Sequence, residues 1–236
     1  MGIREASEQL LSLVQQNVNS FRSVPDMAAR QFAAAGLMRC CALLRGVLVL
    51  EDAKLPHLAG ILARQHWETW LVSLHAVLRG DEALNEIAGD DIYWKRRLSD
   101  RLKLGLTYHD DWEGRAAKLN FKSLAERLKP LLIAAGESGN PNGATGYDVT
   151  YGIQSLFAVH AGLATIGAYL VYGPETWGVE PNPPAPFPNV AQTPALHTAH
   201  LASYVFKVFG LDTGPLEPIW EELLDRQHVG PEARQD

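Results

Sequence analysis

The sequence predicts an all-α protein, a single bundle of six to eight helices around a central apolar helix. Apolar residues recur at helical spacing through most of the 236 residues, a pattern typical of amphipathic helices. No alternating run of Val, Ile and Thr bounded by hairpin turns indicates a strand. Residues 147–172 carry no formal charge after Asp148 and are long enough for about seven helical turns. We therefore expect this stretch to be the central helix.

Composition favours one helical domain over residues 1–236, with a core over about 25–225. Hydrophobic residues make up 47% of the chain and charged residues 20%, so a substantial core can be buried. The net charge of −6 disfavours broad binding to RNA or to an acidic membrane surface. Cys40 and Cys41 are adjacent in an apolar helical run, where they point about 100° apart. Free thiols fit a reducing cytoplasm, which is the location we expect.

Helical periodicity divides the first third of the chain into three expected helices. The first is amphipathic and covers 3–22. Pro25 is expected to open the second, because proline is tolerated in a first turn, and its Ala-rich run continues to about Leu50. Two acids, at Glu51–Asp52, are expected to begin the third, since acids favour a helix N-terminus. The third helix should end at Gly80.

Shorter helices are expected in the middle of the chain. Asp81 should cap a helix that ends at Ala88, and a helix rich in basic side chains should follow over 90–106. Residues 115–135 resume helical periodicity, and Pro130 is expected to kink or divide them. The glycine-rich and asparagine-rich residues 136–146 are expected to form a linker before the central helix.

A proline-rich loop is expected to separate the central helix from the last two helices. Residues 173–194 hold seven prolines and almost no periodic pattern, which is typical of a loop laid over a bundle. Helices are expected over 191–210 and 215–229, where apolar residues again recur at helical spacing. Residues 230–236 are polar and are expected to fray.

A mixed polar stripe on the third helix is the first candidate site. Arg64 and Glu68 are four residues apart and therefore share a face. The pair is either a structural ion pair that ties helices together or a polar cleft in which Glu68 orients Arg64 toward an anion. The residues that share this face within about 80° of arc are His57, Ile61, Arg64, Glu68, Leu71, His75 and Arg79.

Polar groups on the central helix are the second candidate site. Tyr147, Tyr151 and Ser155 descend one face at four-residue steps. His160 lies five residues after Ser155, about 140° around an ideal helix, so the two do not form a nucleophile–base pair within one regular helix. Either His160 is a core histidine bonded to a carbonyl or to a carboxylate such as Glu68, or it is catalytic. Tyr151, Ser155 and His160 join Arg64 and Glu68 as the candidate catalytic residues.

The central stretch is also long enough to cross a membrane, for which about 20 residues suffice. Gln154, Ser155, His160 and four glycines dilute it, and no basic flank follows. Membrane spans carry basic residues in their cytoplasmic flanks. We therefore expect a buried helix and no membrane partner.

One pair of histidines has the spacing of metal ligands. His197 and His200 lie three apart on one expected helix, which is compatible with shared ligation. No Glu-x-x-His pair of the di-iron type and no His-Glu-x-x-His motif occurs in the sequence. We therefore expect no metal and no cofactor, with His197 and His200 as weak candidates.

Several short motifs occur in an order that resembles a known family. These are the Arg64–Glu68 helix, Trp112–Gly114 before KLNFKSLAERL, the Tyr147, Tyr151, Ser155 and His160 helix, and Phe209–Leu211. Over about residues 30–225 the chain resembles the bacterial all-helical domain-of-unknown-function family 5677. In that family we expect the serine and histidine four apart, whereas here they are five apart. The resemblance implies an all-helical fold and candidate positions, but no reaction.

The chain is also similar in general appearance to the HEPN-like helical group, many of which are metal-independent ribonucleases in defence and toxin systems. Their signature places an arginine four to six residues before a histidine on one helix. No histidine here has that partner. The ribonuclease interpretation therefore needs Arg64 to supply the cation from a neighbouring helix, with His160 transferring protons.

Three functions follow as alternatives. The first is a binding or regulatory module with a polar pocket lined by Arg64, Glu68, Tyr151 and His160, which could form a homodimer. The second is a metal-independent ribonuclease at the same pocket, with RNA as the partner. The third is a metal-dependent helical-bundle enzyme that uses His197 and His200.

Overall fold

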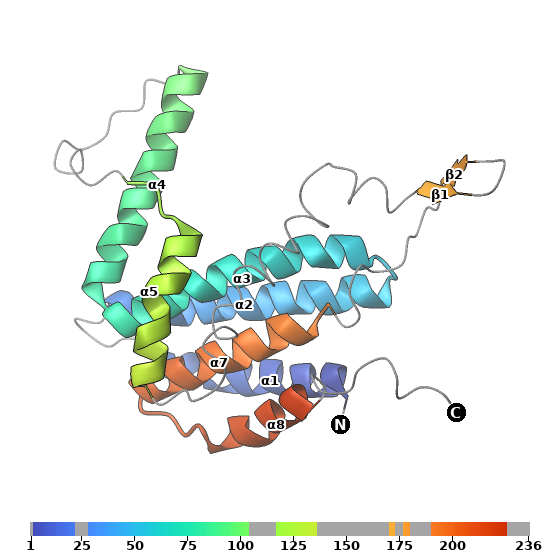
Figure 1. Ribbon diagram of the computed structural model, residues 1–236. Coiled ribbons are helices and arrows are strands. Elements are labelled where there is room, and N and C mark those ends of the chain that lie inside the picture. The colour runs from blue at the N-terminus through green and yellow to red at the C-terminus, as the bar shows by residue number, and fades with distance from the viewer. Residues whose placement is uncertain are drawn as a thin grey trace, which may run out of the picture.

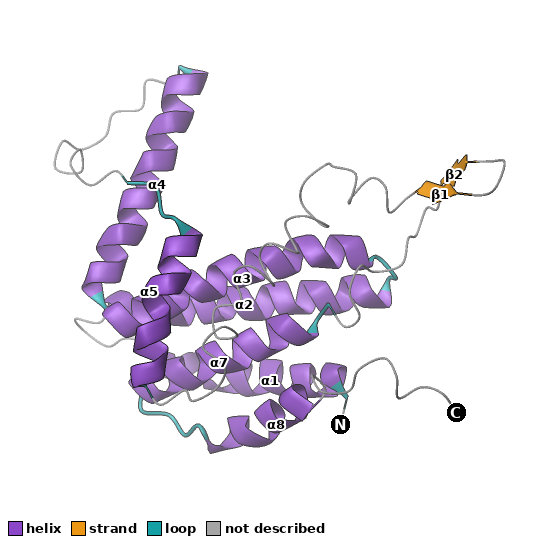
Figure 2. Cartoon of the chain, viewed as in Figure 1, coloured by secondary structure: helices purple, strands orange, loops and turns teal. Residues whose placement is uncertain are grey.

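The computed structural model describes residues 2–21, 28–103, 117–135, 170–172, 177–179 and 190–225. Within these residues the chain is all-helical apart from two short strands (Figures 1 and 2), so the predicted fold class is confirmed. The α-helices are α1 (Ile3–Asn17), α2 (Ala28–Asp52), α3 (Pro56–Arg79), α4 (Asp81–Leu102), α5 (Phe121–Ala134), α7 (Gln192–Val208) and α8 (Glu217–Asp225).

An antiparallel hairpin of α2 and α3 forms the centre of the described bundle (Figure 1). The two helices approach closely at Gly36, where an added Cβ would lie 1.8 Å from Ser73 Oγ. Arg39 Nε donates to Thr69 Oγ1 at 3.3 Å across the same seam. Because Gly36 has no side chain, the backbones can pack more tightly here than any larger residue would allow.

The remaining helices cover the hairpin from two directions. In Figure 1, α7, α1 and α8 lie along one side of it, while α4 and α5 cross one end. Two short 3-10 turns, Val18–Phe21 and Gly214–Leu216, adjoin α1 and α8. Phe21 in the first turn packs on α7, with ring centroids 6.1 Å from Phe206. These contacts bury one continuous core, which Trp67, Trp70 and a set of leucines fill.

The boundary between α2 and α3 differs from the prediction. Glu51 and Asp52 end α2 and do not begin α3, because α3 starts at Pro56, in the first-turn position that proline favours. The connection between them turns at Lys54, which has φ 58°. Glu51 instead accepts a hydrogen bond from Ala191 N at 3.1 Å, so it anchors the segment that leads into α7.

The two helices predicted at 81–88 and 90–106 are one helix, α4. The prediction divided them at Gly89, since glycine costs a helix roughly 0.5–1 kcal/mol relative to alanine. Gly89 is buried inside α4, and its carbonyl accepts from Ala117 N at 3.2 Å. The described part of the chain leading into α5 is therefore hydrogen-bonded to α4 at this glycine.

Helices α7 and α8 lie within the predicted ranges 191–210 and 215–229, whereas α5 begins at Phe121 and not at residue 115. Asn120 caps α5 by accepting from Ser123 N at 3.1 Å, a favoured N-cap arrangement. Pro130 lies inside α5 without ending it. After the proline-rich segment come α7 and α8, which confirms the predicted last two helices.

The end of the predicted central helix is wrong. Leu170–Tyr172 is a strand, β1, and pairs antiparallel with β2, Trp177–Val179, with Val171 opposite Gly178. A short apolar run is ambiguous between helix and strand when only its periodicity is read, and β1 is rich in β-branched and aromatic residues. Residues 147–169, the rest of the predicted central helix, lie outside the described residues.

Helix α2 is also long and apolar enough to cross a membrane, by length and composition only. A core helix of a soluble protein passes the same test. The inward face of α2 is buried against α3 and α7, whereas Arg45 and Val49 are exposed. This packing accounts for the apolar residues on the inward face of α2.

Candidate functional site

Arg64 and Glu68 form the predicted ion pair on α3. Arg64 Nη2 lies 3.3 Å from Glu68 Oε1, and the two side chains are only 17% and 19% exposed. The other carboxylate oxygen, Glu68 Oε2, accepts from Gln65 Nε2 at 3.4 Å. The pair joins two successive turns of one helix and is largely withdrawn from water.

The electrostatics of Glu68 set this pair apart from an ordinary surface pair. Burial raises the pKa of the Glu68 carboxyl above its usual value, and the positive charge of Arg64 opposes the rise without cancelling it. Removing a carboxylate from water costs free energy unless a partner compensates. Arg64 therefore offsets only part of the cost of burying the Glu68 carboxylate.

The other members of the predicted stripe do not share one environment. The structure exposes Ile61, half-buries Arg64, Glu68 and Arg79, and buries His57, Leu71 and His75. The stripe is therefore not one continuous polar face, and its half-buried charged section in the middle of α3 is Arg64 with Glu68.

Tyr151, Ser155 and His160 lie outside the described residues, as does Tyr147. The described half of the predicted pocket is therefore the Arg64–Glu68 section of α3. The meeting of that section with the tyrosine, serine and histidine positions stays a prediction.

His197 and His200 on α7 meet Trp70 of α3. The ring of His197 stacks on Trp70, with centroids 4.1 Å apart and planes at 11°. Trp70 Nε1 donates to His200 Nδ1 at 3.3 Å. Burial, together with the neighbouring His66 and His200 rings, holds the pKa of His197 well below its ordinary value. Both imidazoles are thus committed to aromatic and hydrogen-bonding contacts across the α3–α7 seam.

A third histidine, His66, belongs to the same seam. Its Nε2 lies 2.7 Å from Thr198 Oγ1, and the Thr198 hydroxyl donates to Pro194 O at 2.8 Å. A hydroxyl has one hydrogen to donate, so His66 Nε2–H must be the donor to Thr198. Burial lowers the pKa of His66 to about 3, and the ring is neutral at pH 7.

This seam does not assemble a metal centre in the described part of the chain. Among those residues, no group of three or more His, Cys, Asp or Glu side chains could hold a metal ion. A structural zinc site needs four protein ligands and a catalytic one needs three. Among the described residues, His197 and His200 have no third ligand.

A polar cluster that the sequence did not predict joins α3, α4 and α5. Arg127 on α5 donates to both oxygens of Glu86 on α4, at 2.9 and 2.7 Å. Glu86 Oε2 also lies 3.3 Å from Nε2 of the buried His75 on α3. The Arg127 hydrogen bonds hold the pKa of Glu86 below its usual value. The sequence signal was weak, because Glu86 and Arg127 are 41 residues apart and share no helical spacing.

The fold and these contacts define an all-α helical bundle with a half-buried ion pair on its central hairpin. The chain matches no protein-family model, no curated protein and no solved structure. Its resemblance to family 5677 and to the HEPN-like group remains a prediction based on the short motifs.

Proposed function

We propose that the protein is a helical binding module that takes an anionic ligand at the Arg64–Glu68 section of α3. The supporting observation is the ion pair itself, 3.3 Å long and less than one-fifth exposed at either side chain. Tyr151 and His160 are proposed as further lining residues, which would complete a polar pocket between α3 and residues 147–169.

Stability alone gives little reason for this pair. An ion pair four residues apart on one helix contributes only about 0.3–0.5 kcal/mol. Burial meanwhile raises the pKa of Glu68, which shows that the ionised carboxylate is held at a cost. A pair whose carboxylate is held at a cost in desolvation is better explained by a task at that position than by stability.

The task we propose is orientation of the Arg64 guanidinium. A guanidinium is planar and recognises carboxylate or phosphate groups through a fixed fork of N–H donors. Contact with Glu68 restricts the Arg64 side chain to one direction along α3. A restricted side chain loses less conformational entropy when a ligand binds, which improves affinity.

The test is thermal unfolding of the full chain with a panel of anions: inorganic phosphate, a mononucleotide, a short carboxylate and an RNA oligonucleotide. We expect at least one to raise the Tm of the wild type and to have little effect on the double variant Arg64→Met/Glu68→Leu. The matched control is Asp91→Leu/Lys95→Met, which removes an exposed ion pair of the same spacing on α4. Equal responses in wild type and Arg64→Met/Glu68→Leu would show that the pair is structural.

The RNA arm also separates binding from the ribonuclease alternative. Cleavage of the oligonucleotide by the wild type, lost in both Arg64→Ala and His160→Ala, would favour a metal-independent ribonuclease. Binding without cleavage supports the binding module. Light scattering on the same samples tests the proposed homodimer.

We also propose a cytoplasmic location. The support is that Cys40 and Cys41 are both free and buried, as expected for thiols in a reducing compartment, and that one face of the long apolar helix α2 packs into the bundle.

A further inference from the structure

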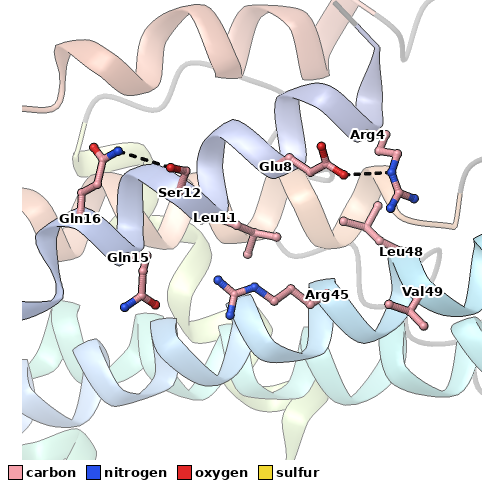
Figure 3. A pocket seen from close by; sticks show the side chains of 9 residues that line it. All are labelled: Arg4, Glu8, Leu11, Ser12, Gln15, Gln16, Arg45, Leu48 and Val49. Atoms are coloured by element: carbon pink, nitrogen blue, oxygen red, sulfur yellow. Dashed lines mark hydrogen bonds and ion pairs between the residues drawn. The ribbon is translucent and has the colours of Figure 1, made fainter.

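A hollow between α1 and α2, on the side of α2 away from α3, has the features of a second binding site. It has a volume of about 520 Å³, within the roughly 300–1,000 Å³ typical of small-molecule pockets. Figure 3 shows it from close by. Its lining residues are Arg4, Glu8, Leu11, Ser12, Gln15, Gln16, Arg45, Leu48 and Val49.

The hollow exists because α1 packs mainly on α7 and α8 and touches α2 lightly. Buried side chains of α1 such as Leu10 and Val14 join the core, while Leu11 closes the floor from α1 and Leu48 closes it from α2. Val49, at the rim, is 62% exposed. The floor is therefore apolar and one apolar side chain at the rim faces water.

Charges are arranged unevenly around the hollow. At one end Arg4 is neutralised, because its Nε contacts Glu8 at 3.0 Å and its Nη1 contacts Asp52. At the other end Arg45 has no carboxylate within ion-pair distance among the described residues. Figure 3 shows its guanidinium reaching from α2 toward α1, beside Leu11 and Gln15. The lining carries two arginines and one glutamate, a net of +1.

Nearby groups do not compete for the charge of Arg45. Cys41 lies one turn earlier on α2, but burial raises the pKa of its thiol to about 12, so it is neutral at pH 7. The facing side chain from α1 is Gln15, whose amide can donate a second hydrogen bond to an anion held by Arg45. Gln16 and Ser12 bond to each other at 3.3 Å.

We propose that this hollow binds a small amphipathic monoanion, a carboxylate on an apolar chain. Arg45 and Gln15 hold the carboxylate, and the apolar chain lies over Leu11, Leu48 and Val49. At the other end Arg4 meets both Glu8 and Asp52, one positive charge against two negative ones, so this end repels a second negative charge and favours a monoanion over a dianion. This site is separate from the Arg64–Glu68 section of α3 and does not depend on it.

The test is calorimetric titration of the full chain with octanoate as the probe, and with octanol and acetate as its two halves. We expect octanoate to bind more tightly than either half. Arg45→Gln should weaken octanoate binding about tenfold or more, because it removes a charge-assisted hydrogen bond worth roughly 1.5–3 kcal/mol. The same variant should leave octanol binding unchanged, since octanol carries no charge.

Two further variants make the result decisive. Val49→Ala should weaken both octanoate and octanol, since it removes apolar area at the rim. Arg39→Gln is the matched control, because Arg39 lies on α2 but contacts Thr69 of α3, and it should bind octanoate as the wild type does. Failure of octanoate to bind, equal binding by Arg45→Gln, or equal weakening in Arg39→Gln would each overturn the proposal.

Discussion

Two arginine–glutamate pairs in this protein contain the same chemical groups and differ in what they connect. Arg64 and Glu68 are neighbours on α3 with one contact of 3.3 Å. Arg127 and Glu86 join α5 to α4 through two hydrogen bonds of 2.9 and 2.7 Å. Burial raises the pKa of Glu68, whereas the Arg127 hydrogen bonds lower the pKa of Glu86.

The opposite pKa shifts show which pair stabilises the fold. A carboxyl whose pKa is lowered in the folded state makes the fold more stable when it is ionised, and one whose pKa is raised does the reverse. Glu86 therefore contributes to stability at pH 7, in part by holding three helices at one junction. Glu68 does not, which is why we assign its pair to binding.

A large effect of pH on stability is expected from His66, and it must be separated before the two carboxylates are compared by pH. Its pKa is about 3 in the folded protein, so the stability it contributes is present above 6.5 and is lost as pH falls. The loss should be about 1.4 kcal/mol per pH unit and approach roughly 5 kcal/mol near pH 3. Urea unfolding of wild type and His66→Gln between pH 7 and 4 measures it.

His66→Gln should give the shallower decline with acid, because it has no imidazole to protonate in the unfolded state. Parallel declines in the two proteins would mean that another group dominates acid sensitivity and that His66 is charged in the fold.

The next effect is the loss of the α4–α5 bridge. Glu86→Gln should lower the free energy of unfolding at pH 7 by about 1–3 kcal/mol, since it weakens two charge-assisted hydrogen bonds and the contact to His75. The control is Glu82→Gln, because Glu82 pairs with Arg79 while 61% exposed. That variant should change stability by less than about 0.5 kcal/mol. A loss in the control equal to that in Glu86→Gln would remove the distinction.

A smaller effect is the difference in the pH range over which Glu86 and Glu68 change the free energy of unfolding. The Glu86 contribution is lost as pH falls below 4.5, the ordinary value, because its folded pKa is lower. Glu68 changes stability above pH 4.5, because its folded pKa is higher than the ordinary value. Protonation of Glu68 in the folded state relieves the cost of burying its charge, so its contribution to stability rises as pH falls. Both variants are compared with a parent protein, and all three carry His66→Gln. As pH falls, the free energy of unfolding of Glu86→Gln should decline less steeply than that of the parent below pH 4.5. That of Glu68→Gln should decline more steeply than that of the parent above pH 4.5. Slopes in the opposite order would contradict the assignment.

Helical periodicity was enough to predict the fold class and most helices, because amphipathic faces repeat in sequence as they do in space. The α2–α3 turn was missed, since its positive φ falls on Lys54, a residue type that gives no turn signal. The continuity of α4 was missed because Gly89 is covered by packing that is not visible locally.

The site was predictable only where its residues are neighbours in sequence. Arg64 and Glu68 were found through their four-residue spacing. The contact between His66 and Thr198 joins residues 132 apart, and the Glu86–Arg127 bridge depends on how α4 and α5 cross. Such contacts follow from tertiary packing, for which one sequence carries no spacing rule.

The most direct test of the central claim is the free energy of unfolding at pH 7 of two matched double variants. Arg64→Met/Glu68→Leu should stay within about 1 kcal/mol of the wild type, because apolar residues of similar volume can replace a buried ion pair without loss. Glu86→Leu/Arg127→Met should lower the free energy of unfolding by about 2 kcal/mol or more, since it removes the two hydrogen bonds between α4 and α5 and the contact of His75 with the Glu86 carboxylate. Equal losses, or the larger loss in the α3 pair, would contradict the account.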